Sequence, residues 1–442
     1  MAWYLYDKHF ADKKQTQANF QLMSTDRTTE TFRAFRNRNY TLFFTGQSIS
    51  QIGTWMQRTA VCWVIYSLTH SAFMLGLAVF AQQFPSFLFS LPGGIAADRY
   101  DRYKILLVTQ TASMVQAVLL AILVLTNHFV IWEILALSVV LGIINAFDMP
   151  ARQPMVHEMV NDKGDIANAL AFNSALVNVA RLIGPALSGI VLQTFGAGIC
   201  FSLNALSFVA VISSLLLMKL PEFKPPAIKK KLRSELYEGF EYLKQTSSIG
   251  ILILLITSLG LVVLPYDTIL PVFAKVIFKG NAATFGYISS FIGLGAILGS
   301  LSLASMKKGR NLKIILLTSI AILGIGLIFF SRITYFPVAM LFAILIGLGS
   351  LTPMTACITI IQMEAASHMR GRVMSYVAMG YFGMLPLGSL IVGAVSQQIG
   401  APDTMLCQGI MAILIAIVFT NLMKNHLHMT ESKDILTKPT TQ

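Results

Sequence analysis

Residues 94–104 read GIAADRYDRYK, and the charged part of this stretch separates two long windows that contain no Asp, Glu, Lys or Arg. The windows run from Ala72 to Ala97 and from Ile105 to Trp132. Each is long enough for one helix to cross the hydrocarbon layer of a membrane, which takes roughly 20 apolar residues. The pattern predicts two transmembrane helices joined by a short charged loop.

The same alternation continues along the whole chain of 442 residues, of which 55% are hydrophobic and only 12% charged. A water-soluble domain of this size could not cover such an apolar core with so few polar groups. Further uncharged windows cover residues 182–218, 280–306, 333–363 and 373–402. We therefore predict an all-α integral membrane protein of about twelve transmembrane helices.

These windows and the loops between them define two halves of six spans each. In the first half the predicted spans are residues 40–67, 72–96, 105–126, 130–150, 167–194 and 198–219. In the second half they are residues 249–274, 282–305, 312–331, 335–362, 371–398 and 402–423. We expect a polar cytoplasmic segment at 1–39, six-helix bundles at 40–219 and 249–423, a linker at 220–248 and a cytoplasmic tail at 424–442.

Two features of the charged segments support this division. The linker carries four apolar residues at helical spacing, which predicts an amphipathic helix along the membrane face: Leu232, Leu236, Phe240 and Leu243. The charged loop at residues 98–104 is echoed by a basic loop at residues 307–313. Such an echo is expected of a duplicated transporter whose two similar halves enclose a central site.

The net charge of +13 reports membrane topology and not a nucleic-acid partner. In the twelve-span arrangement, 28 of the 33 Lys and Arg residues fall in the termini and in the loops after even-numbered spans. The exceptions are Lys275, Lys279 and Arg332 on the other side, and Arg58 and Arg181 within spans. By the positive-inside rule, both termini are cytoplasmic.

The first 39 residues are polar and show no cleaved targeting segment, so we expect the first span to direct insertion. Both Met1 and Met23 are candidate translation starts. The four cysteines fall within spans without close pairing, which predicts small buried apolar side chains and not metal ligands or disulfides: Cys62, Cys200, Cys357 and Cys407.

Enzymatic motifs are missing from the sequence. It contains no GxxxxGK[ST] loop for nucleotide phosphates and no GxSxG nucleophile elbow, and His157-Glu158 lacks the second histidine of a zinc-binding helix. We therefore expect no enzyme activity, no cofactor, no metal site and no self-contained use of ATP.

The stretch at residues 94–104 resembles the loop motif GxxxDRxGRK of the major facilitator superfamily, with Asp101 in place of the commoner Gly and Tyr103 inserted. A carboxylate at a helix end can accept hydrogen bonds from a neighbouring helix N-terminus and can pair with arginine. The resemblance implies that Asp98 and Arg102, with Asp148 as an acceptor at the end of the fourth span, form a cytoplasmic latch in one conformation.

Residues 180–189, ARLIGPALSG, resemble the antiporter motif GxxxGPxxGG of the same superfamily. Gly184 and Gly189 permit close helix approach, and Pro185 frees a backbone carbonyl so that the helix can bend. The resemblance favours export, although ordinary helix packing would use the same residues. The superfamily motif RxxxG of the fourth span would place its proton-linked arginine where this chain has Ser138, so that form of coupling is not implied.

Five blocks in order resemble the enterobactin-exporter branch of the superfamily, which also includes macrolide-efflux-like members: residues 52–58, 145–153, 168–170, 180–185 and 370–374. The resemblance implies a monomeric, alternating-access exporter in the bacterial inner membrane. We expect it to export a medium-sized metabolite such as a siderophore in exchange for protons. A multidrug or macrolide pump, a lipid flippase and a receptor without transport are the alternatives.

Ionisable groups within spans are costly and usually face a cavity, so they are the candidate site residues. Gln51, Trp55 and Arg58 share one helical face and offer an amide, an indole and a guanidinium, which suits an anionic, aromatic ligand. Arg58 can instead pair with a neighbouring helix, and Arg181 can pair structurally or meet the substrate. Asp267 is the candidate proton carrier, with an ordinary hydrated carboxylate as the alternative.

Overall fold

The computed structural model describes residues 31–127, 129–160, 162–220, 232–305 and 311–437. Parts of four predicted segments lie outside these residues: 1–30 of the N-terminal segment, 221–231 of the linker, 307–310 of the basic loop at 307–313 and 438–442 of the tail. The side chains of Lys163 and of residues 232–237, 239 and 423–437 also lie outside the description.

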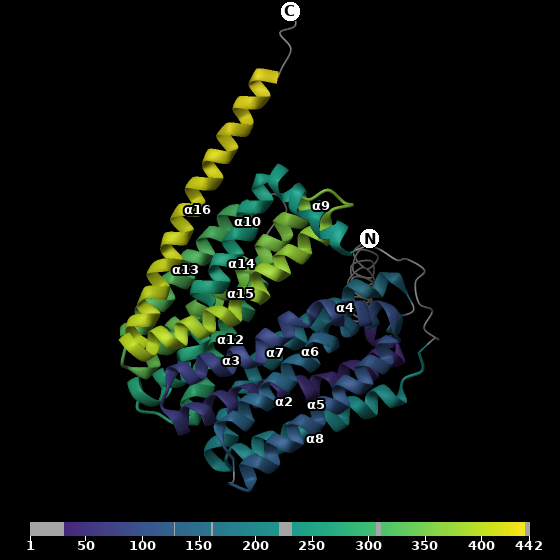
Figure 1. The fold of residues 1–442 in the computed structure, drawn as a ribbon, viewed down its shortest axis with the longest axis vertical. Helices are drawn as coiled ribbons and strands as arrows, with labels where there is room; N and C mark the ends of the chain where they lie inside the picture. The colour runs from purple at the N-terminus through teal and green to yellow at the C-terminus, as the bar shows by residue number, and fades with distance from the viewer. Residues whose placement is uncertain (1–30, 128, 161, 221–231, 306–310, 438–442) are drawn as a thin grey trace, which may run out of the picture.

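Six membrane-crossing spans form the first half (Figure 1). After a short 3-10 helix, η1 (Arg33–Arg36), the helices are α2 (Arg38–Thr69), α3 (Ala72–Leu88), α4 (Ser90–Arg99), α5 (Arg102–Leu125), α6 (Ile131–Met159), α7 (Lys163–Thr194) and α8 (Ala197–Leu217). α3 and α4 are the predicted second span, bent by 45°. Pro92 explains the bend, because it lacks the N–H that would donate to the carbonyl of Leu88, the last residue of α3.

The linker helix and six more spans form the second half. The regular helices are α9 (Leu232–Gln245), α10 (Ser247–Ser258), α12 (Ala282–Ala304), α13 (Leu312–Arg332), α14 (Phe336–Glu364), α15 (Arg370–Ile399) and α16 (Ala401–Thr437). α9 confirms the predicted linker helix, and α16 continues past the predicted end of its span at residue 423.

The seventh span is irregular after α10. It continues as a π-helix η2 (Leu259–Val263), a 3-10 helix η3 (Leu264–Ile269), a short α11 (Leu270–Val272) and a second π-helix η4 (Phe273–Ile277). Pro265 and Pro271 each remove a backbone donor from this span, which explains why regular hydrogen bonding fails here. Such π and 3-10 segments occur frequently at functional sites.

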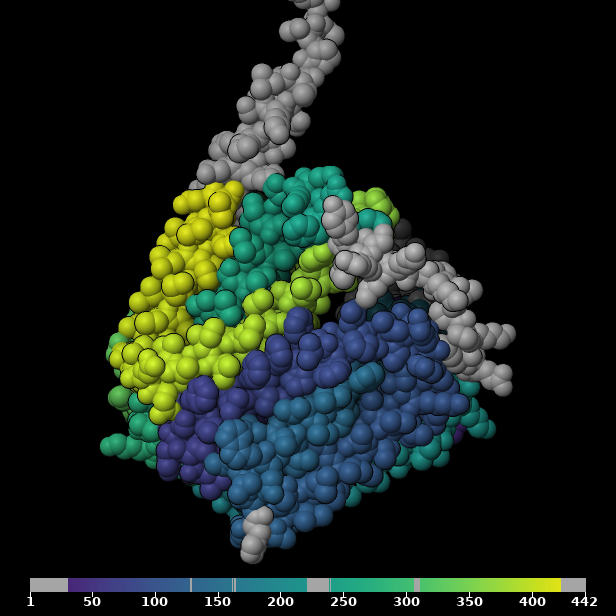
Figure 2. Space-filling view, in the orientation of Figure 1, coloured from purple at the N-terminus to yellow at the C-terminus, as the bar shows by residue number. Residues whose placement is uncertain are grey.

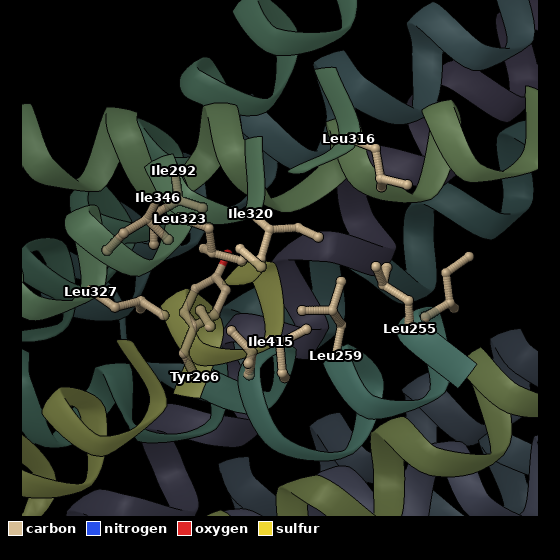
Figure 3. Packing of buried hydrophobic residues seen from close by; sticks show 14 of the residues in the cluster. Leu255, Leu259, Tyr266, Ile292, Leu316, Ile320, Leu323, Leu327, Ile346 and Ile415 are labelled. Carbon is tan, nitrogen blue, oxygen red and sulfur yellow. The ribbon is translucent and has the colours of Figure 1, made fainter. Parts of the chain in front are cut away.

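A packed core holds the irregular span in place despite its missing backbone bonds. Figure 3 shows Leu259 and Tyr266 of this span among apolar side chains of the surrounding helices, and both are buried in the main hydrophobic cluster of the second half. Ile320 and Leu323 of α13 and Ile415 of α16 belong to the same cluster. Asp267, the neighbour of Tyr266, is therefore carried on a fixed piece of backbone.

Ten helices of the described residues are long and apolar enough to cross a membrane, and the bent pair α3–α4 makes eleven. We count α2 as the twelfth span, whose 32 residues include Gln47, Gln51, Gln57 and Arg58. These polar side chains lower the hydropathy of α2, and Gln47 and Gln57 are buried inside the bundle. The predicted fold class, about twelve helices in two halves, is confirmed.

The two halves pack against each other through α3 with α15 and α7 with α12. Glycines make this approach close: a Cβ added at Gly76 would lie 2.5 Å from the carbonyl oxygen of Ser389, and one added at Gly286 would lie 2.4 Å from that of Pro185. Gly189 meets the same helix, α12, at Ala283 and Gly286. The predicted bend motif of α7 therefore also forms part of the interface between halves.

The two halves are in close contact at one end of the bundle. This end contains the α2–α3 and α15–α16 connections, and we call it the loop end. The halves part toward the opposite end, the linker end, which carries α4 and α9. Figure 2 shows a hollow between the halves on that side. Added Cβ atoms at Gly94 of α4 and Gly371 of α15 would meet nothing within 4 Å. The conformation is therefore open at the linker end.

Corresponding ion pairs occur in the two halves. Arg102, at the start of α5, lies 2.6 Å from Glu158 near the end of α6. Lys313, near the start of α13, lies 3.0 Å from Glu364 at the end of α14. Both pairs join the third span of a half to the fourth, which agrees with the echo between residues 98–104 and 307–313.

The cysteines differ in their surroundings. Cys200 and Cys357 are buried as predicted, whereas Cys62 is half-buried and Cys407 is exposed on the outside of α16. The prediction of a buried side chain was wrong for Cys407, because α16 lies at the periphery and turns one face away from the bundle. Apolar periodicity does not distinguish a face that packs on protein from one that faces lipid.

Candidate central site

An ion pair between the halves marks the centre of the structure. The guanidinium of Arg58 on α2 donates to a carboxylate oxygen of Asp267 on η3 at 3.1 Å. The side chain of Arg58 is 29% exposed and that of Asp267 is 39% exposed, so both are accessible to solvent or ligand. The structure thus brings together the predicted substrate arginine and the predicted proton carrier.

A tryptophan lies beside two arginines in the same region. The guanidinium carbon of Arg58 lies 5.2 Å from the centre of the Trp55 ring, and that of Arg181 lies 5.4 Å from it. Both distances are within the range of cation–π attraction. Two of the four predicted cavity residues, Arg58 and Arg181, therefore lie beside a third, Trp55. Gln51, the fourth, lies one turn earlier on α2 and makes no hydrogen bond to the described residues.

Gly184 of the bend motif determines where Trp55 sits. A Cβ added at Gly184 would lie 2.5 Å from the Cβ of Trp55 and 3.2 Å from the carbonyl oxygen of Ile52. Only glycine lets α7 approach α2 this closely, and this approach places Arg181 over the Trp55 ring. The motif thus has a direct geometric role at the site in addition to its role in packing.

Arg58 and Arg181 differ in their partners. Arg58 is paired with Asp267, whereas no carboxylate of the described residues lies within ion-pair distance of Arg181. Two tyrosines complete the region: the charges of Arg181 and Asp267 act on the hydroxyls of Tyr266 on η3 and Tyr381 on α15. Sequence reasoning missed both tyrosines. Tyr266 could have been found from its position beside Asp267, but Tyr381 lies in an uncharged window without any distinguishing pattern.

A buried amide chain fixes the rotation of α2. Asn204 of α8 donates to Gln57 at 2.8 Å, Gln57 donates to Gln116 of α5 at 3.0 Å, and Gln116 donates to the carbonyl of Leu137 at 3.2 Å. Because neighbouring residues on a helix point about 100° apart, anchoring Gln57 inside the first half directs Arg58 toward the second half.

Replacing Gln57 with leucine is expected to destabilise the protein by about 1–3 kcal/mol, because Asn204 and Gln116 would each lose a buried partner. Thermal unfolding in detergent measures this effect. Gln51→Leu is the matched control on the same helix, since Gln51 has no hydrogen bond to lose. Equal melting temperatures for the two variants would contradict the anchoring role of Gln57.

The three predicted latch residues are not brought together in this conformation. Asp98 is exposed at the end of α4 and forms no ion pair with the described residues. Arg102 pairs with Glu158 and also donates to the carbonyl of Ala97 at 3.1 Å.

Asp148, the predicted acceptor of the latch, is buried and already has partners. It accepts hydrogen bonds from Thr109 at 2.8 Å and Gln110 at 2.6 Å and pairs with Arg152. Sequence reasoning did not identify these partners. Arg152 keeps one buried nitrogen, Nε, without a partner among the described residues. The latch remains a prediction for the conformation that is closed at the linker end.

Replacing Asp98 with asparagine is expected to lower transport about tenfold without changing the melting temperature, because the carboxylate has no ion pair to lose here and is needed only when the linker end closes. Flux and unfolding are measured on the same preparation. Asp403→Asn, which removes the exposed 2.8 Å pair with Arg332 at the loop end, serves as the control. Normal flux in Asp98→Asn would refute the latch.

Within the described residues, no group of three or more His, Cys, Asp or Glu side chains is placed to hold a metal ion. The centre offers two guanidiniums beside an aromatic ring, and the side chains of Arg58 and Asp267 are partly exposed. It can bind an anion by charge and a flat ring by stacking. It presents no activated nucleophile.

Residues 29–441 match the family model of the transmembrane secretion effectors. The Staphyloferrin A transporter of Staphylococcus aureus is 28% identical over 85% of this chain and 94% of its own. The multidrug efflux pump Tap of Mycolicibacterium fortuitum is 22% identical over 80% of this chain and 88% of its own. Among solved structures, a point mutant of the nucleoside transporter NupG is 12% identical with a TM-score of 0.72, covering 87% of this chain and 99% of that one. At this identity NupG supports the fold alone.

Proposed function

We propose that this chain, which belongs to the transmembrane secretion effector family and is an efflux transporter of the major facilitator superfamily, exports a medium-sized metabolite with anionic groups, such as a siderophore. It is a multi-pass protein of a bacterial membrane and not an enzyme. The substrate, the coupling ion and the topology are the parts that we propose.

The observation that supports the proposal is that positive side chains outnumber negative ones at the centre. Two guanidiniums lie over Trp55, and a single carboxylate, Asp267, is paired with one of them. The net positive charge favours an anionic ligand, and the indole ring of Trp55 favours one with flat or aromatic parts. A siderophore-like chelator with oxyanion groups has this chemistry, and the relative named as a Staphyloferrin A transporter supports the choice.

We further propose that the linker end faces the cytoplasm of a bacterial inner membrane, with both termini on that side, because the basic loops gather there. The hollow seen in this conformation would then accept substrate from the cytoplasm. Alternating access would move the opening to the loop end for release. A monomer contains both halves of the central site and needs no second copy to form it.

We also propose the proton as the coupling ion, carried by Asp267. This carboxylate lies at the interface between halves on irregular backbone, where a change of its charge acts directly on the pair with Arg58. In an exchange cycle, a proton taken up from outside would occupy Asp267 while the empty transporter returns. The proposal does not use Ser138, which stands where the superfamily has its proton-linked arginine.

The test compares culture supernatants and cell extracts of an iron-starved deletion strain and its complemented parent by untargeted mass spectrometry. We expect one iron-binding compound to fall outside the deletion strain and to rise inside it. Complementation with Arg181→Gln should fail to restore release, whereas Asp403→Asn should restore it. Identical supernatants would refute the siderophore assignment.

A multidrug pump is the second candidate, favoured by the similarity to the pump named Tap and by the aromatic wall of the site. It predicts that the deletion strain becomes susceptible to several unrelated drugs, macrolides included, with unchanged release of the iron-binding compound. A susceptibility panel run on the same strains distinguishes the two functions.

A further inference from the structure

We propose that Arg181 is a permanent anion site of the central cavity, and that Arg58 becomes a second anion site only when Asp267 carries a proton. This inference rests on the proposed function, export of an anionic metabolite. It adds that the site can bind one or two anionic groups of the substrate, and that binding of the second group depends on protonation of Asp267.

Arg181 is available to a ligand in the conformation observed. Its guanidinium lies over Trp55 at 5.4 Å, and no described carboxylate lies within 4.0 Å of it. A half-buried arginine without a carboxylate partner attracts an oxyanion, which it can hold through two parallel hydrogen bonds. The charge of Arg181 also acts on the hydroxyls of Tyr266 and Tyr381.

Arg58 is occupied. Asp267 accepts from its guanidinium at 3.1 Å, so a ligand oxyanion has to displace that carboxylate to reach it. Arg58 of α2 contacts Asp267, and the other ionisable groups in electrostatic reach of this region are Cys62 of α2, Arg181 of α7, Tyr381 of α15 and the neighbouring Tyr266. Among the described side chains, Arg58 and Arg181 are therefore the positive charges available to it.

The net charge of the site then distinguishes ligands with one anionic group from ligands with two. Two arginines and one ionised aspartate leave one positive charge, which a ligand with a single anionic group neutralises at Arg181. A second anionic group placed at Arg58 would face the displaced, ionised Asp267, and an uncompensated charge in a partly desolvated site is costly. A proton on Asp267 removes this repulsion, so the second group and the proton bind cooperatively.

The coupling of transport follows from the charge of the cargo. A substrate with one anionic group leaves Asp267 free to exchange a proton during the return step. A substrate with two anionic groups carries the recruited proton outward with it, so its export is driven by the membrane potential and not by the proton exchange proposed above. Outward movement of negative charge is in turn favoured by an inside-negative potential.

The experiment uses the full chain in lipid nanodiscs and two flat probes, benzoate with one carboxylate and isophthalate with two. Isothermal titration in two buffers of different ionisation enthalpy measures the protons taken up on binding. We expect uptake of about one proton with isophthalate and about none with benzoate. Because this result comes from the unaltered protein, it does not depend on a variant that folds.

Variants test the assignment of each group. Asp267→Asn should bind isophthalate at least about tenfold more tightly and without proton uptake, because the amide no longer competes for Arg58. Arg181→Gln should lose benzoate binding. Asp403→Asn, at the loop end, should match the unaltered protein for both probes.

The outcomes separate this inference from the proposed function. Binding of both probes with equal proton uptake, or with none, would overturn the proton-gated second site and leave an anion exporter standing. Failure of a folded protein to bind either probe would overturn both the inference and the anionic substrate class.

Discussion

Replacing Gly184 with alanine is expected to reduce transport at least about tenfold and to lower the melting temperature, although the change adds a single methyl group. That methyl would lie 2.5 Å from the Cβ of Trp55, closer than real side-chain atoms approach. Both atoms are attached directly to helix backbone, so neither can turn away, and α2 and α7 have to separate. Overpacking of this kind costs typically about 1–3 kcal/mol, and here it also moves Arg181 away from the indole.

Gly371→Ala is the matched control, because its added Cβ would meet no atom within 4 Å on α15 at the open linker end. Gly371 lies in the first turn of α15, where an added methyl group meets no other atom, so this variant should be about as stable as the parent. Flux and unfolding are measured on both variants. A Gly184→Ala protein with normal flux and stability would show that the contact between α2 and α7 is not required.

The close contact between Gly184 and Trp55 shows what could and could not be predicted from the sequence. The motif GPxxGG marks Gly184 as a packing glycine, but the partner is more than a hundred residues away along the chain. No periodicity identifies that partner, since nearly every face of these helices is apolar. Membrane spans, loops and the charged side of the bundle are recovered from composition because the bilayer sets their length and charge.

The pair of Arg58 and Asp267 shows the same limit. Each residue was a candidate by itself because an ionisable group within a span is costly. Their contact at 3.1 Å depends on the way the two halves face each other, which the sequence does not state. The predicted latch of Asp98, Arg102 and Asp148 is not assembled in this conformation, and the sequence alone does not state in which conformation its residues would meet.

The closed loop end should depend on one glutamine of α15. The side-chain oxygen of Gln397 accepts from the hydroxyl of Ser71 at 3.0 Å and from the backbone N–H of Ala72 at 2.8 Å. These groups stand at the N-terminus of α3, where backbone donors lack partners within the helix. The second half thus caps a helix of the first half, and the cap has to break whenever the loop end opens.

Gln397→Leu is therefore expected to shift the population toward the state that is open at the loop end and closed at the linker end. Two hydrogen bonds of about 1 kcal/mol each correspond to a shift of roughly tenfold or more in the equilibrium. Spin labels on cysteines placed at the exposed positions Tyr100 and Met363, with the four native cysteines changed to alanine, report the separation of the halves at the linker end. The short-distance population should increase in the variant.

The neighbouring Gln398 provides the control, because it is exposed and makes no hydrogen bond to the described residues. Gln398→Leu removes the same amide from the same turn of α15 and should leave the distance distribution unchanged. If both leucine variants shift the distances equally, polarity at the membrane surface controls the opening and the cap does not. If only Gln397→Leu shifts them, one side chain holds the halves together at the end where substrate leaves, and transport requires that contact to form and break once per cycle.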